Sequence, residues 1–388
     1  MLEYSTPIAG FRFEGQGTKL ALMRESKLDL SSASMTKPTS AKRRFTPIGI
    51  ILTAAGIALF IYFVNRAGLG QIYDGVKRLG AGFILIIAIA GLRHVVRSAA
   101  WCLCMEAPYR LKFSDALRAR LMGDAIGNIL PIGSFALAEP SKPILIRDRV
   151  PLMAGFSSFV IENIFYALSV IVFVFSGMVA LLLTFHLPKG LRIASFVTLG
   201  VIVALVLISL VLVRMQVRFV SGAAAFTHKH GVDAKWIDKA RMFEDRVYGF
   251  YLRNARRFLP ILLLESIFHL AGVLEIYVTL YFISPEQAPT FFTAFILESV
   301  NRIITMAFKF IPLRMGVDEA GTGKVSKILR FTEAAGVTLA IVRKGRDLFW
   351  AFVGLALLVQ RGFSLRAIEA EAQALSALEP SVMQPKET

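Results

Sequence analysis

The chain has few charged residues for its length and almost no cysteine. Only 18% of its 388 residues are Asp, Glu, Lys or Arg, whereas 55% are hydrophobic and 31 are phenylalanine. A soluble domain of this size does not have such a composition, which excludes an ordinary soluble enzyme or binding module. Cys102 and Cys104 form a C-x-C pair without a neighbouring histidine, so we expect packing residues and no metal site.

The sequence also lacks a nucleotide-binding loop. Gly321-Thr-Gly-Lys324 superficially resembles a phosphate loop, but Asp318 stands where the first glycine is needed. Val325 follows the lysine where serine or threonine is required. We therefore expect no cofactor, and any transport by this chain is expected to be passive or coupled to an ion.

Long apolar runs are what the chain does have, and its mean hydropathy is +0.62. About 20 apolar residues suffice for a helix to cross a bilayer. Segments of that kind are Pro47–Val64, Ala81–Met105, Gly155–Phe185, Ala194–Val213, Phe258–Ile283 and Gly336–Val359. Two shorter runs, Leu117–Leu130 and Phe291–Ile311, lead into similar segments in which a proline turn precedes a carboxylate. Those segments contain Pro131 followed by Glu139, and Pro312 followed by Glu319.

Basic residues predict the orientation of the chain. The net charge is +17, and its excess lies before the first apolar run and between Arg214 and Arg257, which places both regions in the cytoplasm. The short Ser284–Pro289 connection has no basic residue and is expected outside. Both basic regions lie in the cytoplasm, and Ser284–Pro289 lies outside, if the two shorter runs do not cross the membrane. We therefore expect Leu117–Leu130 and Phe135–Arg149 to form a re-entrant hairpin from the cytoplasm, and Phe291–Arg330 to form a second hairpin from the opposite face.

The expected fold is therefore an all-α polytopic membrane protein with about six full spans plus two oppositely oriented re-entrant hairpins. Such an inverted-topology repeat permits alternating access to a site at the middle of the membrane. We expect a disordered basic cytoplasmic tail (1–46, with Met35 a possible translation start), a membrane domain (47–361) and a cytoplasmic tail (362–388). The membrane domain would contain repeats at about 81–185 and 258–360, joined by an amphipathic loop (214–257) that lies on an anionic leaflet or is an ordinary connector. Because the basic residues flank apolar runs, nucleic acid is not an expected partner.

Ionisable side chains at membrane depth are the best indication of function, because each is costly to bury. Arg93 and Arg97 lie four apart on one helix face, and the forked guanidinium suits a lipid phosphate. The alternative is charge pairing that only joins helices, such as Glu162 with Arg343 or Glu298 with Arg302. The full set is Arg93, His94, Arg97, Asp124, Glu139, Glu162, Glu265, His269, Glu275, Glu298, Arg302, Lys309, Arg314, Asp318, Glu319, Arg343, Lys344, Arg346 and Asp347.

These residues occur in motifs that resemble the membrane domain of lysylphosphatidylglycerol synthases and their stand-alone flippase-like relatives. The motifs are Arg97-Ser-Ala-Ala-Trp101, Asn128-Ile-Leu-Pro131 with Glu139, and Ile311-Pro-Leu-Arg-Met-Gly-Val-Asp-Glu319, with a P-x-x-x-G-V-x-E pattern in the last. The chain departs from the family at Glu162-Asn-Ile-Phe-Tyr166, where relatives have Glu-Arg-x-x-Asp. The sequence Gly-Val-Asp-Glu-Ala320 and the chain length are similar to a branch associated with hopanoid synthesis.

The resemblance implies lipid translocation across a bacterial inner membrane, with both termini cytoplasmic. It also implies no catalytic domain, because only 27 residues follow Arg361. We expect an anionic headgroup or phosphate as the ligand, and a homodimer or lipid biosynthetic enzymes as possible partners. The alternatives are a membrane-embedded lipid-modifying transferase and a non-catalytic subunit of a lipid biosynthesis complex. The expected substrate-binding residues are Arg93, Arg97, Glu139, Glu162, Arg302, Arg314, Asp318, Glu319 and Arg343.

Overall fold

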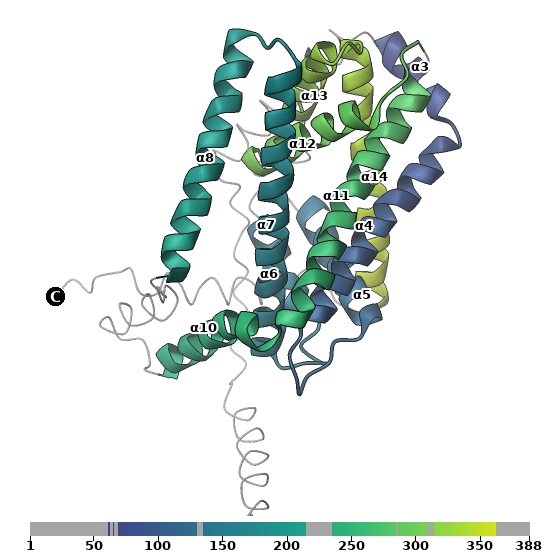
Figure 1. Ribbon diagram of the computed structural model, residues 1–388. Helices are drawn as coiled ribbons and strands as arrows, with labels where there is room; N and C mark the ends of the chain where they lie inside the picture. Colours follow the sequence, from purple (N-terminus) through teal and green to yellow (C-terminus); the bar gives the residue numbers. More distant parts are fainter. Residues whose placement is uncertain are drawn as a thin grey trace, which may run out of the picture. The chain divides into compact units, whose positions relative to one another are not determined.

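The computed structural model describes residues 61, 62, 65, 69–129, 135–214, 235–284, 286–308, 311 and 314–361. All of these belong to one compact unit, Pro47–Thr388, and their regular structure is helical. The helices, drawn in Figure 1, are α3 (Leu69–Leu79), α4 (Gly82–Cys104), α5 (Phe113–Ile129), α6 (Phe135–Ile144), α7 (Leu152–Thr184), α8 (Lys189–Arg214), α10 (Lys235–Arg253), α11 (Ala255–Ile283), α12 (Phe291–Ala307), α13 (Val317–Ile328) and α14 (Glu333–Gln360). Most of Pro47–Val64, both tails, Lys309, Pro131 and Pro312 lie outside the described residues.

Four of the described helices are long and apolar enough to cross a membrane. They are α4, α7, α11 and, within α8, Lys189–Ile208. The apolar runs predicted these helices with bounds that differ by only a few residues. The helix expected at Gly336–Val359 is present as α14 but is not among the four, because charged residues interrupt it at Arg343, Lys344, Arg346 and Asp347. The structure thus supports a multi-pass membrane protein.

The two shorter apolar runs form α5 and α12, the first helices of two helical hairpins. α5 packs on α6, and α12 packs on α13. Each hairpin also contacts the long helix that precedes it, since α5 touches α4 and α12 touches α11. The third contact of each hairpin comes from the other half of the chain: α14 packs on α5, and α7 packs on α12. In Figure 1 the α12–α13 hairpin lies beside the upper part of α7, and α5 lies lower in the view.

Glycines allow these contacts between the two halves. A side chain at Gly354 in α14 would collide with the backbone of Leu121 in α5. A side chain at Gly177 in α7 would similarly collide with Ser299 in α12. In each half, a long helix therefore approaches the hairpin of the opposite half at a closely packed glycine.

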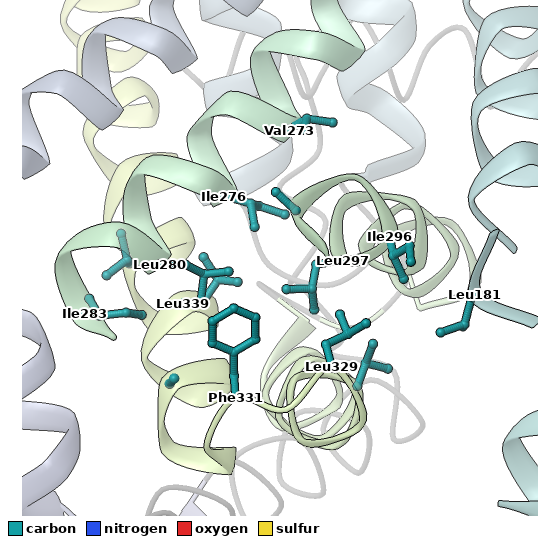
Figure 2. Packing of buried hydrophobic residues seen from close by; sticks show 14 of the residues in the cluster. Leu181, Val273, Ile276, Leu280, Ile283, Ile296, Leu297, Leu329, Phe331 and Leu339 are labelled. Atoms are coloured by element: carbon teal, nitrogen blue, oxygen red, sulfur yellow. The ribbon is translucent and has the colours of Figure 1, made fainter. Parts of the chain in front are cut away.

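The largest apolar cluster joins α7, α11, the second hairpin and α14 (Figure 2). Leu280, Leu297 and Leu339 are almost completely buried in it. Thr290 begins α12 by accepting a hydrogen bond from the Thr293 N–H at 3.1 Å, and Thr332 begins α14 by accepting one from Ala335 at 3.0 Å. Such caps satisfy N–H groups that a helix end leaves without a partner. The caps and the cluster fix the second hairpin against the helices that carry the charged residues.

The amphipathic segment predicted between the repeats includes helix α10. Its Val247 and Phe250 are buried against Phe165 of α7 and Ile261 of α11. At its end, Arg253 donates two hydrogen bonds of 3.1 Å to Glu106, which follows α4. These contacts attach α10 to the helix bundle. The structure does not describe residues 215–234, so the expectation of an interfacial surface is untested there.

Candidate functional site

A cavity of about 220 Å³ lies where six helices of both halves meet. Helices α4 and α5 supply one side of its wall, and α7, α11, α12 and α14 supply the remainder. Five arginines line it, together with two aspartates, one histidine and three aromatic residues. The lining residues are Ala90, Arg93, His94, Arg97, Arg120, Asp124, Tyr166, Phe268, Arg302, Arg346, Asp347 and Trp350.

Arg93 and Arg97 contribute to the cavity from consecutive turns of α4, as their four-residue spacing predicted. The Nη1 atom of Arg93 donates a 3.2 Å hydrogen bond to Glu275 of α11. The Nε atom of Arg97 donates a 2.9 Å hydrogen bond to Glu162 of α7. Each guanidinium thus connects α4 to another long helix while part of it faces the cavity.

Arg302 and Arg120 extend the row of guanidinium groups onto the two hairpins. Arg302 donates a 2.5 Å hydrogen bond to Glu298 one turn before it, which confirms the pair expected from the sequence. Arg120 donates one of 3.0 Å to Glu162. Arg120 was not among the predicted site residues. Its four-residue spacing to Asp124, which also lines the cavity, was the available signal.

Aromatic rings support the guanidinium groups. The Cζ atom of Arg97 lies 3.8 Å from the ring centroid of Tyr166. Arg93 and Arg302 both lie over Phe268, at 4.5 and 4.8 Å. A ring face attracts a cation, and stacking restricts the guanidinium to a fixed orientation. Sequence reasoning did not select Tyr166 or Phe268, because the chain contains 9 tyrosines and 31 phenylalanines.

The charges around the cavity are arranged in two layers. The side chains of Arg93 and Arg97 are each 13% exposed, whereas their partners Glu275 and Glu162 are 2% and 0% exposed. The glutamates are absent from the cavity wall. They compensate buried cations whose isolated burial would be strongly unfavourable. An anion that enters the cavity therefore meets the N–H groups of Arg93 and Arg97 before it meets Glu275 or Glu162, while Asp124 and Asp347 are the carboxylates that share the wall.

A second polar cluster adjoins the cavity at the first hairpin. Lys142 of α6 lies 2.9 Å from Asp124 and 3.0 Å from Glu139. Asp124 also lies 3.5 Å from His94, which lines the cavity. The side chain of Glu139 is 41% exposed, so this predicted residue lies at an open edge of the site. Lys142 is buried and was not predicted, although its three-residue spacing from Glu139 was an available signal.

Glu319, the counterpart of Glu139 in the second hairpin, has a different environment. Its carboxylate is fully buried, accepts a 2.7 Å hydrogen bond from the Gly316 N–H and forms an ion pair with Lys344. Gly316 has a φ of 79°, a conformation that glycine adopts without strain. Glu319 therefore stabilises the start of α13, and this position favours a structural role over the expected contact with a headgroup.

The expected pair between Glu162 and Arg343 is wrong. Arg343 instead donates a 2.9 Å hydrogen bond to Asp318, and Glu162 pairs with Arg97 and Arg120. Arg343 and Asp318 are buried between α14 and α13 and do not line the cavity. The error arose because sequence spacing shows which residues share a helix face but not which faces of distant helices meet.

Three of the predicted site residues, Arg93, Arg97 and Arg302, line the cavity directly. Glu162 lies behind the wall, and Arg314 reaches it through a 3.2 Å hydrogen bond to Asp347. The residues placed apart from the cavity are Asp318, Glu319 and Arg343. Among the described residues no three His, Cys, Asp or Glu side chains are grouped as metal ligands.

Residues 48–363 match the family described as the lysylphosphatidylglycerol synthase TM region. The chain belongs to this family. The match covers all of the helices described above, so the cavity lies inside the lysylphosphatidylglycerol synthase TM region itself. Neither a curated protein nor a solved structure matches the chain.

Proposed function

We propose that this protein binds the phosphate of a membrane lipid in the arginine-lined cavity and moves the lipid headgroup across a bacterial inner membrane. The single observation that carries the proposal is the group of five guanidinium groups on the cavity wall, supplied by both halves of the chain. Membership of the lysylphosphatidylglycerol synthase TM family supports a function connected with membrane lipids.

The chemistry of the wall favours a phosphate group. Arginine presents several N–H donors in a planar fork that fits two phosphate oxygens at once. Arg93 and Arg97 keep part of their side chains open to the cavity although each already contacts a glutamate. In an interior of low polarity, such donors stabilise an anion more strongly than they would in water. A volume of about 220 Å³ accommodates a headgroup but not the acyl chains, which would remain in the bilayer.

The distribution of the wall residues favours movement over chemical modification. Arg120 comes from the first hairpin, Arg302 from the second, and Arg346 from the last long helix. A transporter built from inverted repeats places its site between the repeats, where each half can expose it to one side. A transferase would gather its polar groups near one face to reach a soluble donor. We infer that the two hairpins are re-entrant and control access from opposite sides.

The proposal is tested in proteoliposomes that contain lipids with a fluorescent headgroup label. A membrane-impermeant reductant bleaches the label in the outer leaflet, so lipid movement appears as bleaching beyond the outer fraction. The full-length protein is expected to move labelled phosphatidylglycerol. Arg97→Gln and Arg302→Gln are expected to slow this movement at least about tenfold, which corresponds to about 1.4 kcal/mol of activation free energy.

Arg192→Gln is the matched control, because Arg192 is exposed near the start of α8 and does not line the cavity. It should move lipid as the wild type does. Size-exclusion profiles and thermal melting in detergent establish that the Arg97 and Arg302 variants are folded. Normal lipid movement in both folded variants would refute the assignment of the cavity. Covalent modification of the lipid, detected by mass spectrometry without movement, would favour the transferase alternative.

A further inference from the structure

Glu265, in α11, is a buried carboxyl group without a hydrogen bond to any of the described residues. Its side chain is 0% exposed, and its closest cation is Arg97, whose Nε atom lies 3.9 Å from Oε2. Neither carboxylate oxygen of Glu265 has a hydrogen-bond partner in the part of the chain that the structure describes. Arg97 donates instead to Glu162, at 2.9 Å. Glu265 thus lies beside a guanidinium that is already engaged by another carboxylate.

The other buried glutamates around the cavity are bonded differently. Glu275, on the same helix, accepts hydrogen bonds from Arg93 and Arg346. Glu298 accepts hydrogen bonds from Arg302 and Asn301. An ionised carboxylate in an apolar interior needs such donors, and without them it takes up a proton. Among these groups, Glu265 is therefore the position where a proton is most favourable.

Charge balance connects that proton to the ligand. When Glu265 is ionised, Glu162 and Glu265 together balance the two cations beside them, Arg97 and Arg120. When Glu265 is protonated, the same four groups carry one net positive charge. A lipid phosphodiester carries one negative charge, so only the protonated group is electrically matched to it. Phosphate binding at the cavity side of Arg97 and proton binding at Glu265 should strengthen each other.

We propose that Glu265 binds the proton that accompanies each lipid phosphate into the cavity. The proposal rests on the proposed function, and it makes the protein a proton-coupled carrier. The phosphate contacts Arg97 from the cavity while the proton resides behind it, and both leave on the same side. The charged and titratable groups nearest to Glu265 are Arg97 and Cys104 on α4, Arg120 on α5 and Glu162 on α7.

The test measures protons on binding, without any need for transport. Detergent-purified full-length protein in weak buffer receives a short-chain phosphatidylglycerol, and a pH indicator reports proton exchange. At a pH high enough for Glu265 to be ionised in the lipid-free protein, the wild type should take up close to one proton per bound lipid. By linkage, lipid affinity measured by calorimetry should fall as pH rises, by up to about tenfold per pH unit. Imposing a pH gradient across proteoliposomes should drive the labelled lipid toward the more alkaline compartment.

Glu265→Gln imitates the protonated carboxyl group, so it should fold and bind lipid without proton uptake and with an affinity that does not change with pH. Ser266→Ala is the matched control, because Ser266 is the adjacent residue on the exposed face of α11. It should take up protons as the wild type does. Lipid binding by the wild type without proton uptake at any pH, or a pH dependence retained in Glu265→Gln, would overturn this inference alone. Absence of lipid binding by the wild type at every pH would refute the proposed function, and the inference with it.

Discussion

Replacement of Glu319 by glutamine tests whether this residue stabilises the fold or handles lipid. The wild-type carboxylate is 0% exposed and pairs with Lys344, which is 9% exposed. The amide of the introduced glutamine keeps one oxygen for the Gly316 N–H but loses the negative charge. Removing one partner of a buried ion pair costs about 3–5 kcal/mol, because the remaining charge stays buried without compensation. Asp318 lies 3.6 Å from Lys344 and offsets part of that loss, so we expect about 3 kcal/mol.

The assay is unfolding of detergent-solubilised protein, followed by tryptophan fluorescence during heating and during titration with denaturant. A double variant provides the control. Glu319→Gln combined with Lys344→Met removes both charges, and such neutral replacements of buried ion pairs are often tolerated. The double variant should therefore recover most of the lost stability. The interaction between the two changes should be about 2–3 kcal/mol, within the range of residues in direct contact.

Lipid movement by the same variants separates the two roles. We expect the double variant to move labelled lipid at close to the wild-type rate, because neither residue lines the cavity. Our reasoning would be refuted if Glu319→Gln lost less than about 0.5 kcal/mol of stability, the size of an ordinary surface substitution, and also abolished lipid movement. That result would indicate that Glu319 binds the lipid headgroup, as the sequence predicted.

Three further predictions concern packing, ligand affinity and helix capping. Gly354→Val should destabilise the protein by about 1–3 kcal/mol in thermal unfolding, because the valine side chain would collide with Leu121. Gly190→Val is the control and should change stability much less, because a side chain at Gly190 would have no neighbouring atom within 4 Å. Phe268→Leu should weaken binding of short-chain phosphatidylglycerol by about 0.5–2 kcal/mol in calorimetry, because it removes the ring under Arg93; unchanged affinity would argue against ring support. Thr332→Ala should lower stability by about 1 kcal/mol through loss of the α14 cap, whereas Thr332→Ser should retain it.

The long helices were predictable from local sequence because burial in a bilayer is a property of each segment. Apolar runs predicted α4, α7, α8 and α11 closely, and the shorter runs predicted the first helix of each hairpin. Four-residue spacing also placed Arg93 and Arg97 on the same face of α4, and both line the cavity. Helical periodicity is enough for that inference, since it concerns residues on consecutive turns of one helix.

Partners across the bundle were not predictable in the same way. The alternative of structural charge pairing matched Glu162 with Arg343, but Glu162 meets Arg97 and Arg120 instead. The paired proline turns suggested equal roles for Glu139 and Glu319. In the structure the carboxylate of Glu139 is 41% exposed and that of Glu319 is 0% exposed. The difference comes from the neighbouring helices, which the two similar segments do not share.

Local sequence was enough to show that the chain is a membrane protein with charged groups inside its apolar segments, because hydropathy and helical spacing act over a few turns. Tertiary structure decided which guanidinium groups face the cavity, which glutamates lie behind them, and that Glu265 is left without a hydrogen bond among the described residues. Those outcomes depend on contacts between helices far apart in the chain, such as α4 with α11 and α5 with α14. Those contacts decide how many hydrogen-bond donors lie near a buried carboxyl group. With donors it stays ionised and joins helices, and without them it can bind and release a proton.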